Sequence, residues 1–336
     1  MLTEWNELPP GFLEAAPHEL EALLDGPALI HLAGRRGPSL FVSVLLHGNE
    51  TTGLEAIQQV LSRHSGRPLP RDLSLFVGNV AAAARGRRRL DGQPDYNRLW
   101  PGGDAEDSPE RRMAAEVVDI MRGRGCFASI DIHNNTGVNP HYGCINRLSP
   151  RYVHLATLFS RIVVYFTQPR GVQSMAFAEL CPAVTVECGQ AGSRHALGHA
   201  VELIESGLHL TGIPEHPARE AFAVYHTVAV VRVRPDVRFG FEEAADLALL
   251  EDLETMNFRE LPVGTVLGRV RNADVMPLIA LDNDGRSVAD DYFEVKNGEL
   301  RTRAHLVPAM LTRDERVIRQ DCLCYVMEAI ESGPEG

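Results

Sequence analysis

Short apolar runs alternate with amphipathic segments through the first two thirds of the chain. An apolar run of about four to eight residues between turn residues is typical of a buried strand, and apolar residues three and four apart are typical of a helix. The pattern predicts strands at residues 39–46, 73–79, 127–132, 161–166 and 183–187, and helices at residues 53–63, 109–122, 151–160 and 194–207. Because strands and helices alternate, we expect an α/β domain with a largely parallel sheet and helices on both faces.

The pattern changes after residues 212–217. Residues 225–233 alternate and are rich in valine, and later apolar runs are separated by turn signals at 282–285 and 296–299. Short strands divided by such turns are typical of a β-rich domain. Residues 241–257 fit either one helix or an acidic loop. We therefore expect an α/β domain over residues 1–215 and a smaller β-rich domain over residues 216–336.

Composition narrows the class of protein. The chain has 336 residues, 44% of them apolar, and a formal net charge of -12. Such acidity disfavours a nucleic-acid partner, because phosphate binding requires a basic surface. The N-terminus lacks the features of a secretion signal, no apolar stretch is long enough to span a membrane, and the six cysteines form no C-x-x-C pair. We expect a cytoplasmic protein with a small-molecule partner and no membrane partner; a homo-oligomer is compatible with the sequence.

Three potential metal ligands follow predicted strands. His47 and Glu50 follow the first apolar run, and His133 closes the run at 127–132. Ligands of open α/β sheets usually bind at the carboxyl ends of the strands. Two imidazoles and one carboxylate form a typical catalytic zinc set with an open position for water. Asp131 points to the same side of its strand as His133 and is a candidate for orienting that imidazole.

A carboxylate also ends the apolar strand at 183–187. Glu187 next to a metal can act as a general base and then protonate a leaving nitrogen, although a lone Glu there can equally be structural. A rival metal set consists of His195, His199 and Glu202 on one helical face. The zinc-protease pattern requires Glu directly after the first His, where Ala196 stands, so an exposed amphipathic helix explains this set better. His141 has no such context and is interpreted as structural or exposed.

Cationic residues lie in and near residues 95–102, which belong to a long loop between Asn79 and the helix expected at Pro109. An arginine binds a carboxylate with two parallel hydrogen bonds, so Arg98 with Asn97 is a candidate for holding a substrate carboxylate. Arg88 or Arg89 adds a second cation. The alternative is a solvated charged loop.

The order of these motifs resembles the succinylglutamate desuccinylase/aspartoacylase family, which belongs to the zinc-carboxypeptidase-like (M14-type) hydrolases. The motifs are His47-Gly48-Asn49-Glu50, Gly78-Asn79, Asp95-Tyr96-Asn97-Arg98, Asp131-Ile132-His133-Asn134 and Val186-Glu187-Cys188-Gly189. The resemblance implies an α/β fold with a zinc-carboxypeptidase-like mixed sheet and flanking helices, one zinc per chain, and a smaller C-terminal β-rich domain.

The resemblance also implies roles for individual residues. It makes His47, Glu50 and His133 the zinc ligands and Glu187 the general base. It makes Asn97 and Arg98 the residues that hold the substrate carboxylate, and Arg88, with Arg89 as the alternative, the one that polarises the scissile carbonyl.

One position departs from the aspartoacylases. These carry an arginine ten residues before the base, used for the second carboxylate of N-acetylaspartate, and Phe177 stands there in this chain. The departure favours substrates with neutral or apolar side chains, unless Phe177 is a core residue and another cation such as Arg170 takes the role.

We therefore expect a zinc-dependent hydrolase that cleaves the amide bond of a small N-acyl amino acid or related carboxylate-bearing compound. The same residues fit a metallocarboxypeptidase acting on short peptides, or a non-catalytic metal- or ligand-binding module. The presence of Glu187 argues against the last, because binding alone needs no base.

Overall fold

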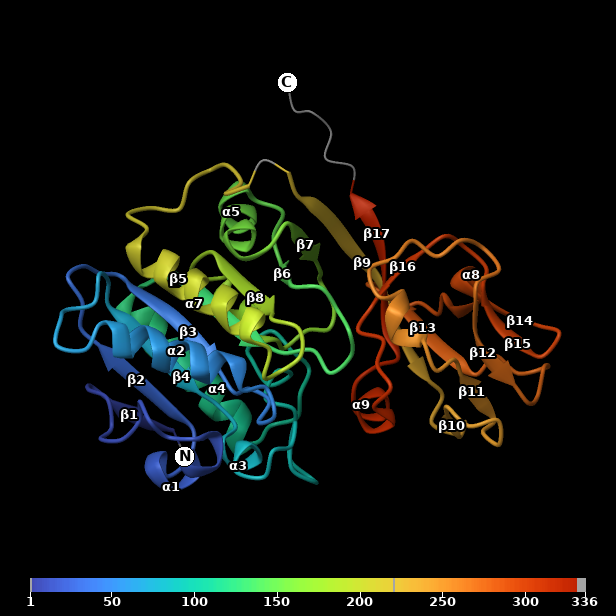
Figure 1. Cartoon of the computed structure of the whole chain (residues 1–336), viewed down its shortest axis with the longest axis horizontal. Helices are drawn as coiled ribbons and strands as arrows, with labels where there is room; N and C mark the ends of the chain where they lie inside the picture. Colours follow the sequence, from blue (N-terminus) through green and yellow to red (C-terminus); the bar gives the residue numbers. More distant parts are fainter. Residues whose placement is uncertain (1, 220, 331–336) are drawn as a thin grey trace. The chain divides into compact units, whose positions relative to one another are not determined.

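A computed structural model describes residues 2–219 and 221–330 of the chain (Figure 1). The chain divides into two compact units. The first contains the residues up to 134 together with 141–165 and 169–222, and the second contains 135–140, 166–168 and the residues from 223 onward. We describe each unit by itself.

The first unit is built on a mixed sheet. Within its described residues the strand order is β1–β2–β4–β3–β5–β8–β6–β7. Strands β4, β3, β5 and β8 run parallel to one another, whereas β2 is antiparallel to β4 and β6 is antiparallel to β8. The bounds are β1 Thr3–Trp5, β2 Ala28–Leu32, β3 Ser39–Val44, β4 Leu73–Val77, β5 Cys126–His133, β6 Tyr142–Ile145, β7 Ile162–Tyr165 and β8 Ala183–Glu187.

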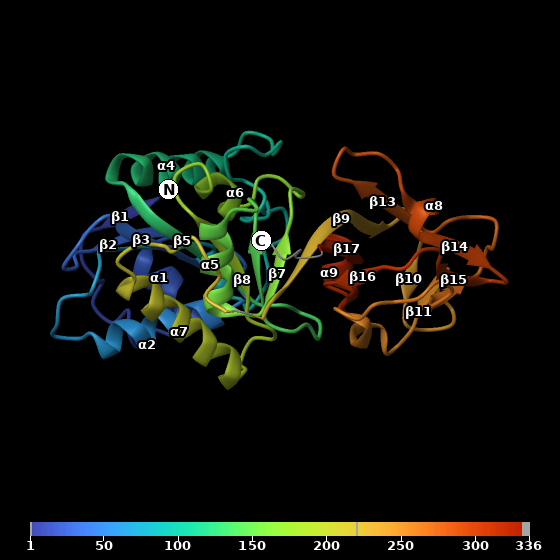
Figure 2. The same cartoon turned by 90° about the horizontal axis from the view of Figure 1, so that it is seen from above.

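Helices cover both faces of this sheet. Figure 2 shows α2 and α7 on one face and α4 and α6 on the other. Every residue of β3 and β4 is buried, as expected for strands covered on both sides. The helical segments are η1 Pro17–Glu19, α1 Leu20–Leu24, α2 Thr52–Arg63, α3 Val80–Ala83, α4 Pro109–Arg124, α5 Pro150–Phe159, α6 Gln173–Phe177 and α7 Arg194–His209.

Local sequence explains where the long helices begin and end. Helix α4 begins after Ser108, whose hydroxyl accepts a hydrogen bond from the Arg111 N–H at 3.1 Å, and Pro109 occupies its first position. It ends at Gly125, which has a φ of 79°. Ser193 caps α7 in the same way by accepting from the Ala196 N–H. Such caps fix the direction in which the next side chains point.

The predicted strands and helices of this unit are confirmed within a few residues of their expected bounds. The sequence did not predict β1, β2 or β6. The last two run antiparallel to their neighbours β4 and β8, so the sheet is mixed. Strand β6 has four residues, Tyr-Gly-Cys-Ile, and its glycine interrupts the kind of apolar run that marks the equally short β7.

The strands of the second unit fall into two groups, the second of which is a five-stranded sheet. Strand β9 (Ala223–Val233) pairs antiparallel with β13 (Leu278–Asp282) and β17 (Cys324–Ile330), and β16 (Val307–Ala309) pairs with β17. The second sheet has the order β10–β11–β12–β15–β14. Its bounds are β10 Phe239–Gly240, β11 Leu247–Leu249, β12 Val266–Val270, β14 Phe293–Lys296 and β15 Glu299–Thr302, and the helical segments are η2 Leu253–Met256, α8 Ala289–Tyr292 and α9 Glu315–Gln320.

Two sequence expectations concern segments of this unit. The predicted turn at 296–299 is confirmed: Asn297 and Gly298 join β14 to β15 with φ values of 55° and 75°, as a two-residue hairpin requires. Residues 241–257 are not one helix, because β11 within them pairs with β12 in the sheet. Among the described residues, no helix is long and apolar enough to cross a bilayer.

Candidate functional site

The turn after β3 holds His47 and Glu50 in buried positions. Gly48, between them, packs against α3 so closely that an added Cβ would lie 2.2 Å from the backbone nitrogen of Ala83. Only glycine permits this approach. The Gly48 N–H donates to the carbonyl of Arg88 at 3.1 Å. The His-Gly-Asn-Glu motif therefore fixes a tight turn and holds two polar side chains at the carboxyl end of β3.

His47, Glu50 and His133 lie together, and we call them the His–Glu–His group. His133 ends β5, which is the parallel neighbour of β3. One ligand atom from each residue lies within 4.8 Å of the other two, and all three side chains are buried. Glu50 stands between the imidazoles: its Oε1 is 2.8 Å from His47 Nδ1 and its Oε2 is 2.7 Å from His133 Nδ1. The structure thus brings together the three residues that the sequence singled out.

Each imidazole contacts a second carboxylate through its other nitrogen. His133 Nε2 lies 2.8 Å from Asp131 Oδ2, and His47 Nε2 lies 3.0 Å from Asp95 Oδ1. The fully buried Asp131 also accepts a hydrogen bond from the Ser43 hydroxyl at 2.6 Å. Carboxylates in this position orient metal-binding imidazoles and raise their basicity. The sequence indicated Asp131 for this position but gave no such role to Asp95, which it included only as the first residue of the motif at 95–98.

The carboxylates and imidazoles of the group strongly change one another's pKa values. Burial disfavours a charge on His133, but the carboxylates of Asp131 and Glu50 outweigh it and hold the pKa of His133 well above its usual value. Burial and the charge of Arg88 both lower the pKa of His47. The carboxylates of Glu50 and Asp95 outweigh them, so the pKa of His47 is raised. The pKa of Glu50 is lowered, because the two imidazoles outweigh its burial. The site therefore favours positive charge between its carboxylates.

The donor set fits a metal ion. His47 Nδ1 is buried and has no hydrogen-bond partner among the described residues, although Glu50 Oε1 is 2.8 Å away. A ring nitrogen that lies this close to a carboxylate oxygen without a hydrogen bond to it is explained if both atoms face a cation. Two imidazoles and one carboxylate match the three protein ligands of many catalytic zinc sites. The His–Glu–His group can therefore hold a metal.

Glu187 lies next to this group at the end of β8. It is the register partner of His133 on the adjacent parallel strand. Burial, with a smaller contribution from the Glu50 carboxylate, raises the pKa of Glu187 to about 7, against the opposing charges of His133, His47 and Arg88. A carboxylate with a pKa near the working pH can both accept and return a proton.

Asn134 connects the turns that carry these residues. Its backbone N–H donates to Glu50 Oε2 at 3.1 Å. Its side-chain amide donates to Thr52 Oγ1 at 2.9 Å and to the Gly189 carbonyl at 2.8 Å, and its Oδ1 accepts from the Thr52 N–H at 3.2 Å. The segments that follow β3, β5 and β8 are thereby joined by one side chain.

The two neighbouring arginines occupy different positions. Arg88 Nη1 lies 3.2 Å from Glu50 Oε1, and its Nη2 lies 3.3 Å from Asp95 Oδ2. Arg89 Nη1 donates instead to the backbone carbonyl of Gln93 at 3.0 Å. Arg88 is therefore the arginine of this pair that contacts the His–Glu–His group.

Asn97 and Arg98 lie beside the group on the loop after α3. The buried Asn97 has its Nδ2 3.4 Å from His133 Nε2, and its Oδ1 accepts from the Gln173 N–H at 3.0 Å. The partly buried Arg98 donates to the Asn97 carbonyl at 2.8 Å. Burial opposes a charge on Asp95, but His47, Arg88 and, with the smallest contribution, Arg98 hold the pKa of Asp95 well below its usual value.

Phe177 is a core residue. It is fully buried on α6 and stacks on Phe41 of β3 with ring centroids 4.1 Å apart. Arg170 is exposed. The side chain of Phe177 therefore gives no support to the substrate preference that the sequence suggested from this position.

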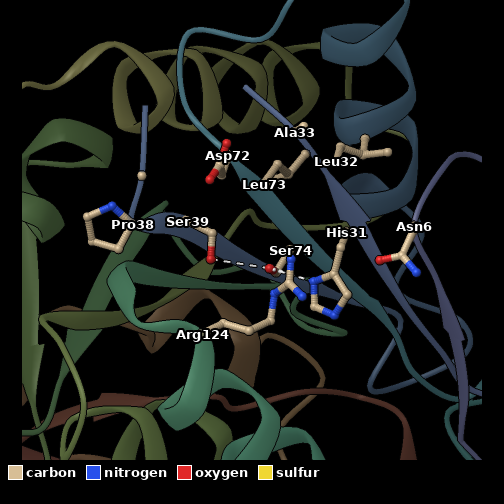
Figure 3. A pocket seen from close by; sticks show the side chains of 11 residues that line it. Asn6, His31, Leu32, Ala33, Pro38, Ser39, Asp72, Leu73, Ser74 and Arg124 are labelled. Atoms are coloured by element: carbon tan, nitrogen blue, oxygen red, sulfur yellow. Dashed lines mark hydrogen bonds between the residues drawn. The ribbon is translucent and has the colours of Figure 1, made fainter. Parts of the chain in front are cut away.

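A separate cavity of about 360 Å³ lies at the opposite edge of the sheet (Figure 3). The cavity opens beside Ser39, the first residue of β3, whereas His47 lies beyond Val44, the last residue of that strand. His31 Nδ1 lies 2.9 Å from the Ser74 hydroxyl, which donates to the Ser39 hydroxyl at 3.2 Å, and Arg124 also lines the cavity. None of the residues predicted for the site lines it.

Known proteins resemble this chain in sequence and in structure. Residues 36–201 match the family described as succinylglutamate desuccinylase/aspartoacylase catalytic domain. A succinylglutamate desuccinylase from Pseudomonas fluorescens (strain SBW25) is 38% identical over 90 residues, which cover 26% of each chain. The match thus spans about a quarter of that relative's length.

Solved structures share the fold at low sequence identity. Succinylglutamate desuccinylase from Vibrio cholerae has a TM-score of 0.60 and 16% identity, over 88% of this chain and 82% of that chain. Murine aminoacylase 3 has a TM-score of 0.54 and 14% identity, over 87% and 95% of the two chains. The fold expected from the sequence, a mixed α/β sheet with flanking helices and a smaller β-rich part, is confirmed. With the sequence match at 36–201, this chain carries a succinylglutamate desuccinylase/aspartoacylase catalytic domain.

Proposed function

We propose that the protein is a zinc-dependent hydrolase that cleaves the amide bond of a small N-acyl amino acid or a related carboxylate-bearing compound. Membership of a family of amide hydrolases supports the reaction class. The observation that carries the proposal is Glu187, a carboxylate whose pKa is raised to about 7 and which is in register with His133 of the His–Glu–His group. A site that only bound a ligand would not require this carboxylate.

His47, Glu50 and His133 would hold the zinc ion, with Asp95 and Asp131 orienting the two imidazoles. A bound zinc supplies Lewis acidity, which polarises a carbonyl group and lowers the pKa of water.

Glu187 moves the proton during the reaction. As the oxygen of a water molecule bonds to the amide carbonyl carbon, the carboxylate of Glu187 accepts a proton from that water. The carbon–nitrogen bond then breaks, and Glu187 returns the proton to the departing nitrogen. The products are a carboxylic acid and an amine, and Glu187 ends the cycle as it began.

Arginine side chains would stabilise charge on the substrate. Arg88, held between Glu50 and Asp95, is the candidate for the developing oxyanion, a contribution of about 3 kcal/mol per donor in other hydrolases. Arg98 and Asn97 are the candidates for the substrate carboxylate, since a guanidinium binds two carboxylate oxygens at once.

Turnover of a defined substrate panel tests this function. The full chain is stripped of metal, reloaded with zinc and assayed with N-succinylglutamate, N-acetylaspartate, N-acyl amino acids with neutral side chains, and short peptides. We expect zinc-dependent release of amine from at least one N-acyl amino acid, and loss of that activity in Glu187→Gln. Cleavage of peptides alone would instead establish a carboxypeptidase. Binding of these compounds without any turnover would overturn the hydrolase assignment.

A further inference from the structure

A second group of histidines lies in the first unit, outside the His–Glu–His group. It consists of His141, which directly precedes β6, and His195 and His199 of α7, and we call it the imidazole triad. The ring centroids are 4.4 Å apart for His195 and His199, 5.0 Å for His141 and His199, and 5.2 Å for His141 and His195. One nitrogen from each ring lies within 4.8 Å of the other two. The sequence alone gave no reason to associate His141 with the two helical histidines.

The sheet brings the three rings together. Strand β6 is antiparallel to β8, and its first residue, Tyr142, is in register with Glu187 at the end of β8. The start of β6 therefore lies at the same edge as the end of β8, from which the chain leads into α7. Ser193 caps α7, and residues four apart project from one face of a helix, so His195 and His199 point together.

His141 is held in place by its neighbours. Its carbonyl accepts a hydrogen bond from the Ser160 hydroxyl at 2.7 Å, and its ring stacks on Phe159 with centroids 5.9 Å apart. His141 and His199 are partly buried, whereas His195 is exposed. The triad thus has two anchored rings and one that faces solvent.

The protonation of the rings suits metal binding. Burial, together with the charges of His199 and His195, lowers the pKa of His141. Burial and the charge of His195 likewise lower the pKa of His199, although Glu202 opposes this. A neutral imidazole offers a lone pair to a metal, whereas a protonated one does not. Imidazole nitrogens suit zinc, copper and nickel rather than magnesium or calcium.

We propose that His141, His195 and His199 form a second metal site, which binds a divalent transition metal such as Zn²⁺, Ni²⁺ or Cu²⁺ independently of the His–Glu–His group. With Zn–N bonds of about 2.0–2.1 Å, ligand nitrogens around one ion lie roughly 3.4 Å apart, so metal binding would draw the three ring nitrogens closer together than the present limit of 4.8 Å. Because His195 faces solvent, water completes the coordination and the ion exchanges readily. A bound ion joins the start of β6 to the first turns of α7.

Zinc titration of the stripped full chain by calorimetry tests this site. We expect two zinc sites in the natural sequence and one in the double variant His195→Ala/His199→Ala. His18→Ala removes an exposed histidine outside both groups and serves as the matched control, with two sites retained. His47→Ala should remove the other site and leave the triad.

A milder variant protects the test against misfolding. His195→Gln changes only an exposed side chain, so circular dichroism should be unchanged while the weaker of the two zinc affinities falls at least tenfold. Nickel provides an independent readout, since it should raise the melting temperature of the His47→Ala chain and have no such effect once His195 and His199 are also replaced. The same number of zinc sites in the double variant as in the natural sequence, or a nickel effect on the His47→Ala chain that survives replacement of His195 and His199, would overturn the proposal. Neither result depends on whether the protein hydrolyses amides.

Discussion

His133 and Glu187 are register partners at the ends of the parallel strands β5 and β8. Adjacent strands are about 4.8 Å apart, so backbone pairing sets how far the backbone of a candidate metal ligand lies from that of the candidate base. Both side chains lie at the carboxyl ends of their strands, at the same end of the sheet as His47 and Glu50, which follow β3. The relationship predicts that the two residues can be changed separately, one affecting metal binding and the other affecting turnover.

Glu187→Gln should lower kcat by roughly two to four orders of magnitude, the usual contribution of general acid–base catalysis. The amide is nearly isosteric with the carboxylate but cannot accept the proton, so zinc content and melting temperature should change little. Glu116→Gln, an exposed change on α4, is the control. Steady-state kinetics on the best substrate measure the effect, and turnover within threefold of the natural enzyme would assign proton transfer to another group.

Asp131→Asn and Asp95→Asn should each weaken zinc binding at the His–Glu–His group by about 10- to 100-fold. Each replaces the carboxylate that contacts the outer nitrogen of an imidazole ligand. Competition with a chelating dye measures the affinity, in chains that also carry His195→Ala/His199→Ala so that one site is counted. Asp119→Asn, an exposed change on α4, should have no effect. Unchanged affinity in both site variants would mean that these carboxylates do not support the ligands.

Zinc binding should release protons at pH 7. The raised pKa values of His47 and His133 mean that the metal-free group retains protons that a metal must displace. Affinity should therefore increase as pH rises from 6 to 8, and the binding enthalpy should differ between buffers of different ionisation enthalpy. Calorimetry in phosphate and in Tris buffer measures the number of protons released. Equal enthalpies in the two buffers would show that the imidazoles are already neutral.

Arg88→Lys and Arg98→Lys should affect different kinetic constants. A lysine keeps the charge but loses the planar pair of donors. Arg88→Lys should lower kcat about 10- to 1000-fold, because its proposed role is in the transition state, whereas Arg98→Lys should mainly raise KM. Arg89→Lys is the matched control, since Arg89 donates to the Gln93 backbone, and should leave both constants within about twofold. The reverse pattern for Arg88 and Arg98 would exchange their roles.

Much of the first unit could be predicted because its signals are local. Apolar runs that end in His47, His133 and Glu187 mark parallel strands, and parallel strands present their carboxyl ends at one edge. The conclusion that these residues meet follows from that rule. The mixed sheet did not follow from periodicity, because β6 is short and its antiparallel direction depends on pairing with β8.

The contacts that could not be predicted depend on side-chain direction or on distant segments. Asp95 reaches His47 from a loop 48 residues further along the chain, and no periodic signal marks such a loop. His141 lies near His195 and His199 because β6 pairs antiparallel with β8, which brings the start of β6 to the end of β8. Phe177 occupies a position that suggested a substrate pocket, yet its ring stacks in the core on Phe41. A motif comparison identifies which residue occupies a sequence position. Whether that side chain faces a pocket or the core depends on which face of its helix carries it, here α6.

The hydrogen bonds of Asn134 have a kinetic consequence. This residue holds Glu50 through its backbone and holds Thr52 and the Gly189 carbonyl through its side chain. The turns after β3 and β8 each bond to Asn134 of the turn after β5, so neither can move outward without breaking hydrogen bonds to this residue. Movement of Glu50 away from an ion in the His–Glu–His group therefore breaks the hydrogen bonds that join its turn to Asn134. We therefore expect a metal there to exchange with solution over hours, while an ion on the solvent-facing imidazole triad exchanges within seconds.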